Sequence, residues 1–138
     1  MVDEYKTITG TSQGTYSELR SKFLGFAHHV TTAEEALSLV ADYQKKYYDA
    51  RHVCWAYMLG AEREVFRSND NGEPSGTAGK PILGQINSRE LTDVIVLVVR
   101  YFGGVKLGTS GLIEAYRTTA SETLDAAEVE CRTVDGTC

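Results

Sequence analysis

Two loops rich in glycine and hydroxyl residues carry the strongest chemical signal in this 138-residue chain. The first loop spans residues 68–79 and the second loop spans residues 101–111, each between an extended segment and a predicted helix. Glycine lets backbone N–H groups approach a ligand closely, and a helix amino terminus attracts anions. With Lys80 and Lys106 beside them, the loops predict a site for a phosphate-like anion. The alternative is that the glycines only shape turns and the hydroxyls only cap helices.

The residues predicted to bind a ligand or partner come from these loops and from the extended segments next to them. They are Arg51, His52, Asp70, Gly72, Glu73, Ser75, Gly76, Thr77, Gly79, Lys80, Arg100, Gly103, Gly104, Lys106, Gly108, Thr109, Ser110 and Gly111. The sequence predicts no catalytic residue, no metal ligand and no cofactor.

Standard nucleotide-binding motifs are absent from both loops. A P-loop requires serine or threonine after Gly-Lys, but Pro81 follows Gly79 and Lys80. The dinucleotide pattern G-x-G-x-x-G does not occur in residues 103–111. The sequence therefore does not favour an ATPase or a dehydrogenase.

Asp70 and Glu73 place two carboxylates in the first loop. Such a pair can perform acid/base chemistry or hold a divalent cation. Asn69 and Asp70 are also residues that bond to their own backbone in turns, and this turn chemistry is the favoured interpretation.

His52 and Cys54 share one face of a predicted strand, so a nucleophilic cysteine beside a histidine is one hypothesis. A cysteine within the apolar residues 53–56 is more typical of a small core residue, which is the interpretation we favour.

The elements that position the loops follow from hydrophobic periodicity. Extended segments are predicted at residues 5–9, 16–30, 53–59, 64–67, 93–100 and 129–134, and helices at residues 33–48, from about residue 77 and from residue 112. A turn region around Gly10 to Gly14 is predicted to separate the first two segments. The run of Val, Ile and Leu at residues 94–99 predicts a strand that is buried on both faces and central in its sheet.

The predicted fold class is α+β. Thr32 followed by Glu35 is a capping box, which predicts that a helix begins at Ala33. The order of strands and helices favours a layered mixed or antiparallel sheet with the helices on one face. A single domain over residues 1–138 fits the length of the chain.

The charge distribution weighs against a protein that binds nucleic acid with its whole surface, because the net charge is −5. The residues from 112 onward hold six acidic and two basic side chains, so the first 111 residues are nearly neutral. A local basic patch around Lys80, Arg100 and Lys106 is compatible with this distribution.

The three cysteines, Cys54, Cys131 and Cys138, show no C-x-x-C spacing. An odd number of cysteines fits reduced thiols in the cytoplasm better than a disulfide framework. The longest apolar run, residues 94–99, is too short to span a bilayer, so we expect no membrane partner.

Three segments, in this order and spacing, closely resemble the YigZ/IMPACT family. They are RHVCWAY at residues 51–57, DNGEPSGTAG at residues 70–79 and VRYFGGVKLGTSGL at residues 99–112. The resemblance covers nearly the whole chain. Two residues depart from the family pattern: Ser110 stands where glycine is usual, and Glu114 stands where arginine is common, so the helix after the second loop is less basic.

The resemblance implies a fold similar to the second domain of the fifth small-subunit ribosomal protein, which also occurs in elongation factor G. It implies a role in translation control, since eukaryotic IMPACT proteins restrain a translation-initiation-factor kinase by competing for its activator. Bacterial YigZ-like proteins usually carry a ferredoxin-like domain after this one. The chain ends about where that domain would start, so we expect a fragment whose carboxy-terminal domain is missing.

Three functional hypotheses follow. The first is a non-catalytic binding domain of translation control, which contacts RNA, the ribosome or a translation-related protein through both loops and requires the loops to meet in space. The second is a phosphate-handling hydrolase or transferase, with Asp70 and Glu73 as metal or acid/base groups and Lys80 and Lys106 holding phosphate. The third is a scaffold for the missing domain, with the loops as the interface.

Overall fold

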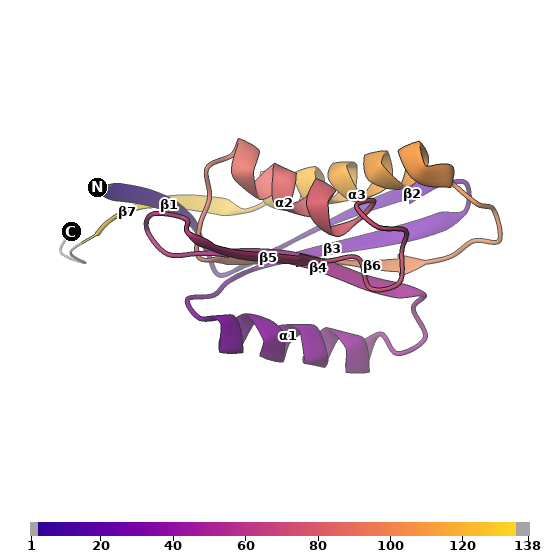
Figure 1. The fold of residues 1–138 in the computed structure, drawn as a ribbon, viewed down its shortest axis with the longest axis horizontal. Coiled ribbons are helices and arrows are strands. Elements are labelled where there is room, and N and C mark those ends of the chain that lie inside the picture. The colour runs from indigo at the N-terminus through magenta and orange to yellow at the C-terminus, as the bar shows by residue number, and fades with distance from the viewer. Residues whose placement is uncertain (1–2, 135–138) are drawn as a thin grey trace.

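The computed structural model describes residues 3–134, which contain seven strands and three helices. The strands are β1 (Glu4–Thr9), β2 (Thr11–Glu18), β3 (Ser21–His29), β4 (His52–Leu59), β5 (Val65–Asn69), β6 (Val94–Tyr101) and β7 (Glu128–Thr133). The helices are α1 (Ala33–Lys46), α2 (Gly79–Ser88) and α3 (Gly108–Asp125). Five strands form an antiparallel sheet in the order β2-β3-β6-β4-β5, and β1 pairs with β7 in a separate ribbon (Figure 1).

β6 lies in the middle of the sheet, as its run of Val, Ile and Leu predicts, between β3 and β4. Successive side chains of a strand point to opposite faces. The even-numbered side chains from 94 to 98 lie in one buried apolar cluster, and the odd-numbered side chains from 95 to 99 lie in another. A strand buried on both faces requires a covering layer on each side of the sheet.

The helices supply these two layers from opposite sides of the sheet (Figure 1). Ala36 and Val40 of α1 belong to one apolar cluster, whereas Ile82 and Ile86 of α2 and Leu124 of α3 belong to the other. The α+β class with an antiparallel layered sheet is therefore confirmed, but the expectation that all helices lie on one face is wrong. Periodicity shows that a helix has an apolar stripe, and it does not show which face of the sheet that stripe will cover.

The capping box at the start of α1 is confirmed. The Thr32 hydroxyl accepts a hydrogen bond of 3.1 Å from the Glu35 backbone N–H. The Glu35 carboxylate in turn accepts one of 2.8 Å from the Thr31 backbone N–H. The first bond satisfies an N–H group that the first helical turn leaves without an intrahelical partner, and the second ties the helix to the residue before its N-cap.

The predicted turn region at residues 10–14 is confirmed only at Gly10, which has a φ of 65° and separates β1 from β2. β2 runs through residues 11–14, and the single extended segment predicted at residues 16–30 is wrong, because the chain reverses at Leu19 and Arg20, between β2 and β3. Both residues have positive φ, 45° and 68°. A tight hairpin turn of this kind normally carries asparagine or glycine, so the sequence holds no signal for it.

Gly14 and Gly25 lie opposite each other in the β2–β3 pair, directly under α3. A Cβ at Gly14 would lie 2.6 Å from the Thr123 backbone nitrogen, and one at Gly25 would collide with the Thr123 hydroxyl. The two glycines therefore let the helix pack closely on these strands. Ser12 adds a hydrogen bond of 2.8 Å to the Thr123 carbonyl oxygen. The carboxyl-terminal half of α3 is thus held in place on the sheet.

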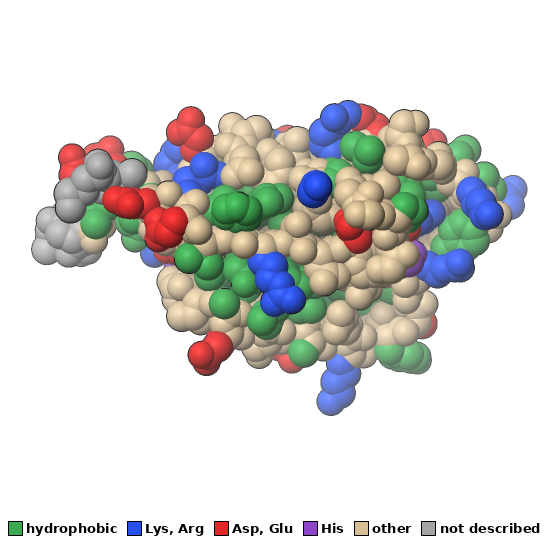
Figure 2. Space-filling model, viewed as in Figure 1, with side chains coloured by type: hydrophobic (Ala, Val, Ile, Leu, Met, Phe, Trp, Pro, Cys, Tyr) green, Lys and Arg blue, Asp and Glu red, His purple; other side chains and the backbone are tan. Residues whose placement is uncertain are grey.

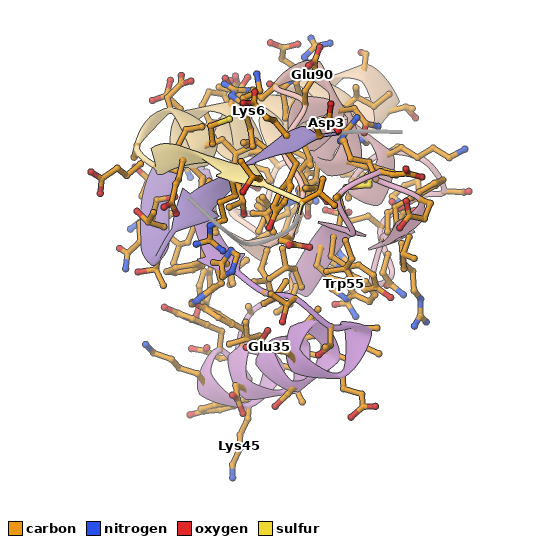
Figure 3. All side chains as sticks on the ribbon, turned by 90° about the vertical axis from the view of Figure 1, so that its left-hand side faces the viewer. Asp3, Lys6, Glu35, Lys45, Trp55 and Glu90 are labelled. Carbon is orange, nitrogen blue, oxygen red and sulfur yellow. The ribbon has the colours of Figure 1, made fainter. Side chains whose placement is uncertain are left out.

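The two ends of the molecule differ in the elements they hold. The β1–β7 ribbon lies at one end, and the second loop lies at the opposite end, between β6 and α3 (Figure 1). Figure 3 looks at the ribbon end and shows Asp3, Lys6 and Glu90 there. Lys6 is exposed, and its backbone pairs with Cys131 of β7.

Cys54 is buried and Cys131 is exposed, and both are free thiols, while Cys138 lies outside the described residues. Among residues 3–134, none of the helices combines the length and the apolar character needed to cross a membrane.

Candidate functional site

The first and second loops meet across a groove of about 570 Å³, which we call the interloop groove. Its lining residues come from both loops, from the adjoining ends of β4 and β6, and from the start of α3. They are Arg51, His52, Gly72, Glu73, Pro74, Arg100, Phe102, Lys106, Leu107, Gly108, Thr109 and Leu112. The geometric requirement of the binding hypothesis, that the two loops lie together, is therefore met.

Strand pairing explains why the loops meet. β4 runs antiparallel to β6, so that His52 at the start of β4 lies opposite Arg100 near the end of β6. Asn71 holds the first loop to β4: its backbone carbonyl accepts a 2.7 Å hydrogen bond from His52 Nδ1, and its side-chain oxygen accepts one of 2.8 Å from the Val53 N–H. The second loop follows directly after β6 and so lies beside the first.

Glu73 is the buried centre of the site. Its Oε2 accepts hydrogen bonds from the Arg100 guanidinium at 2.7 Å and from the Tyr116 hydroxyl at 2.6 Å, and its Oε1 lies 3.3 Å from His52 Nε2. The side chains of Glu73 and Arg100 are only 3% and 6% exposed. Buried charges need this kind of pairing, because an isolated charge would lose its hydration. Burial raises the pKa of Tyr116, so its hydroxyl stays a neutral donor.

Arg100 forms the floor of the interloop groove rather than an exposed contact. Its guanidinium also donates a 3.2 Å hydrogen bond to the Ser21 hydroxyl. It lies near the rings of Phe23 and Phe102, with its Cζ 5.6 Å and 5.4 Å from the ring centroids. Its Nε is buried without a hydrogen-bond partner among the described residues. Arg100 is therefore held by protein groups on several sides, and its charge is offset by Glu73.

Cys54 lies under the same cluster and is part of the core, as its apolar sequence neighbours predict. Its Sγ lies 3.1 Å from the Asp70 carbonyl oxygen and 3.4 Å from the Tyr116 hydroxyl. Burial strongly raises the pKa of this thiol. Because the thiolate is the nucleophilic form of cysteine, Cys54 is unsuited to covalent catalysis.

Asp70 organises the first loop by accepting three backbone hydrogen bonds. Its carboxylate receives the N–H groups of Gly76 at 2.9 Å, Ala78 at 3.1 Å and Gly79 at 2.8 Å. The Asn69 side chain likewise accepts a 2.8 Å bond from the Asn71 N–H. The favoured turn-chemistry interpretation is confirmed. The expectation that the first loop offers its helix amino terminus to an anion is wrong, because Asp70 already occupies those N–H groups.

The hypothesis that Asp70 and Glu73 hold a divalent cation finds no support in this geometry. Each carboxylate is already bonded to protein donors. Within residues 3–134, no group of three or more His, Cys, Asp or Glu side chains is arranged to hold a metal ion.

The start of α3 differs from the start of α2 in lacking a bound carboxylate. Its N-cap, Leu107, makes no side-chain capping bond, and no acidic residue occupies the first turn. The first N–H groups of a helix have no intrahelical acceptors and carry partial positive charge. Lys106 is exposed beside them, and Arg51 is a second exposed residue of the groove lining, with its Cζ 4.7 Å from the Phe102 ring centroid. This wall of the groove is therefore positive.

Besides Asp70, nine predicted site residues do not line the groove although they belong to the two loops or to the first turns of the helices that follow. They are Ser75, Gly76, Thr77, Gly79, Lys80, Gly103, Gly104, Ser110 and Gly111. Lys80 is exposed on α2, and the Thr77 hydroxyl bonds to the Pro74 carbonyl at 2.5 Å. Glu114, the departure from the family pattern on α3, pairs with Arg117. The basic patch predicted around Lys80, Arg100 and Lys106 is therefore not a patch, because Arg100 is buried and Lys80 lies outside the groove.

Six residues of the site were not selected from the sequence: Tyr116 and Ser21 of the buried cluster, and Pro74, Phe102, Leu107 and Leu112 of the groove lining. Tyr116 fits the apolar stripe of α3 and is buried. One signal for it exists, since a buried tyrosine usually needs a partner for its hydroxyl. Ser21 and Phe102 carry no comparable signal, because their contacts depend on how β3 and β6 pair.

Charge is unevenly distributed between the two ends of the molecule. Blue lysine and arginine side chains gather at the right-hand end of the face in Figure 2, where a histidine side chain is also visible, and red acidic side chains are frequent at the left-hand end. The second loop lies at the right-hand end in the same view (Figure 1). On this face of a protein with a net charge of −5, basic side chains are thus more frequent toward the end that holds the second loop (Figure 1 and Figure 2).

A family model described as the Impact N-terminal domain matches residues 19–124. The chain is 38% identical over 125 residues to the IMPACT family member YvyE of Bacillus subtilis, covering 91% of this chain and 58% of that protein. It is 39% identical over 99 residues to the IMPACT family member YigZ of Escherichia coli, covering 70% and 48%. A Protein IMPACT homolog of Saccharomyces cerevisiae is 32% identical over 103 residues, covering 71% and 39%. The chain therefore spans between 39% and 58% of the length of these relatives.

Two solved structures share the fold. A crystal structure of a hypothetical protein has a TM-score of 0.92 at 30% identity, covering 96% of this chain and 66% of that one. The two-domain translational regulator Yih1 has a TM-score of 0.55 at 24% identity, covering 86% and 48%. The second likeness concerns the fold alone.

Proposed function

This chain belongs to the IMPACT family, with residues 19–124 matching the family's amino-terminal domain, and from this premise we propose that it is a binding domain of translation control that holds RNA in the interloop groove. RNA here includes the RNA of the ribosome. The link to translation comes from Yih1, a relative in fold that is described as a translational regulator. The preference for RNA comes from the chemistry of the groove.

The observation that carries the proposal is the positive wall of the interloop groove. Lys106 and Arg51 are exposed there, and the uncapped start of α3 lies beside Lys106. Lysine and arginine side chains, backbone N–H groups and helix amino termini are the groups that bind nucleic-acid phosphates. Glu73 does not neutralise the positive charge of this wall, because its own charge is already offset by Arg100. The groove therefore has unneutralised donors for a phosphate.

A binding role fits the buried cluster better than a hydrolase or transferase does. Cys54 is held as a thiol, Tyr116 as a neutral hydroxyl, and Glu73 is bonded to Arg100. These groups stabilise the groove and connect its two loops. They do not form an activated nucleophile with a free general base.

Removing the two exposed cations of the groove should weaken RNA binding. For Arg51→Ala combined with Lys106→Ala, we expect the Kd for a labelled RNA of about ten nucleotides to rise roughly tenfold or more. The dependence of log Kd on log salt between about 50 mM and 200 mM should also become shallower by roughly 1.4, because each of the two lost phosphate contacts removes roughly 0.7 from a single-strand slope. Fluorescence anisotropy titrations at several salt concentrations measure both quantities.

The matched control is Lys6→Ala combined with Lys45→Ala, which removes the same charge from exposed positions outside the groove (Figure 3). It should leave both the Kd and the salt slope close to those of the parent protein. Equal losses in the two double variants would show that binding follows net charge alone. Absence of RNA binding at low salt would remove the proposal and leave a translation-related protein as the partner to test.

A further inference from the structure

A second hollow adjoins the interloop groove on the other side of the Arg51 and Phe102 side chains. It has a volume of about 340 Å³ and is lined by Asp49, Ala50, Arg51, Tyr101 and Phe102. Arg51 and Phe102 line both cavities, so they form a shared wall. We call this cavity the aromatic hollow.

The two sides of the wall differ in charge. The interloop groove holds Lys106 and the start of α3. The aromatic hollow instead holds Asp49, whose carboxylate accepts a 3.0 Å hydrogen bond from the Tyr101 hydroxyl. A carboxylate repels phosphate, but carboxylates accept hydrogen bonds from the amino groups of nucleobases. A phosphate is therefore favoured on one side of the wall and a base on the other.

The wall and its surroundings offer flat surfaces on which a base can stack. The Arg51 guanidinium lies over the Phe102 ring at 4.7 Å. Tyr101 also lines the hollow. Unpaired bases stack on aromatic rings and on arginine guanidinium planes. A lone exposed aromatic residue needs no explanation, but here the aromatic groups adjoin a cationic groove.

We infer that the RNA bound by this domain is single-stranded, with a phosphate in the interloop groove and the attached or neighbouring base on the aromatic hollow. This inference rests on the proposed function and specifies its ligand. A duplex hides the faces of its bases within the stack, so it presents sugars and phosphates to a surface but no base that can enter the hollow. Only an unpaired nucleotide can use both sides of the wall.

The test compares three RNA probes of equal length and label at one low salt concentration. They are an unstructured single strand of about ten nucleotides, a blunt duplex and a single strand that lacks its bases. The intact single strand should bind roughly tenfold more tightly than the other two. In Tyr101→Ala, its affinity should fall roughly fivefold or more, because stacking on one aromatic side chain of the hollow is lost. Duplex affinity should not change.

Phe66→Ala is the control, because Phe66 is 58% exposed on β5 and lines neither cavity. It should bind all three probes as the parent protein does. The inference is overturned if the duplex or the strand without bases binds as tightly as the intact strand, or if Tyr101→Ala and Phe66→Ala have equal effects. In that case the proposed function is still supported if the variant with Arg51→Ala and Lys106→Ala binds RNA more weakly than the parent protein does. If none of the probes binds, this inference and the proposed function are both contradicted.

Discussion

Replacing Glu73 with alanine is expected to lower the free energy of unfolding by about 3–5 kcal/mol, because it leaves the Arg100 guanidinium buried without its counter-charge. The Glu73 carboxylate pairs with Arg100 at 2.7 Å and accepts the Tyr116 hydroxyl at 2.6 Å, and both partners would lose that acceptor. Chemical denaturation followed by circular dichroism measures the loss. The same variant should also separate the two loops, since Glu73 bridges the first loop to β6 and α3.

Two further variants show whether the lost charge pair is the cause of the destabilisation in Glu73→Ala. Glu62→Ala removes an exposed carboxylate at the opposite end and should change the free energy of unfolding little. Glu73→Leu combined with Arg100→Met removes both charges, and it should recover most of the loss, since apolar replacements of a buried pair are often neutral or stabilising. If Glu73→Ala is as stable as Glu62→Ala, the buried pair does not hold the loops together.

Gly103→Ala is expected to lower the free energy of unfolding by about 1–3 kcal/mol for a steric reason. A Cβ at Gly103 would collide with the backbone carbonyl of Arg20 in the β2–β3 turn. Backbone cannot move aside as a flexible side chain can, so the turn and the second loop would have to separate. Because the Ser21 hydroxyl contacts Arg100 next to this turn, the floor of the groove should shift as well.

Gly84→Ala is the matched substitution, and it is expected to raise the free energy of unfolding. Gly84 lies inside α2, and a Cβ there meets no atom within 4 Å. Alanine should therefore stabilise the protein by about 0.5–1 kcal/mol, since glycine is unfavourable within a helix. Thermal denaturation of the two variants side by side gives the comparison. Stability of Gly103→Ala equal to that of the parent would contradict close packing between the turn and the second loop.

The parts of the fold that can be predicted from the sequence are those that depend on residues close together in the chain. The capping box at Thr32 and the apolar run of β6 are such local patterns, and both are confirmed. The Leu19–Arg20 turn could not be found, because neither residue is typical of a tight hairpin. The side of the sheet that α1 covers depends on packing across the whole domain.

The same distinction between local patterns and long-range packing applies to the site. Asp70 bonds to N–H groups six to nine residues away, and its turn chemistry was predictable from residue types. Glu73 and Arg100 were both selected as candidate residues, but their pairing was not, because 27 residues separate them. Tyr116 is 43 residues from Glu73 and joins the cluster only when α3 packs on the sheet.

The most direct test of the account is a nuclear magnetic resonance titration of the ¹⁵N-labelled domain with a short single-stranded RNA at low salt. The account predicts saturable shifts for the backbone amides of Gly72, Phe102, Lys106 and Thr109, which line the interloop groove. The amides of Lys6 and Glu90, at the ribbon end, should not move (Figure 3). Shifts centred on the ribbon end, or no shifts at any RNA concentration, would contradict the assignment of the groove as the RNA-binding site.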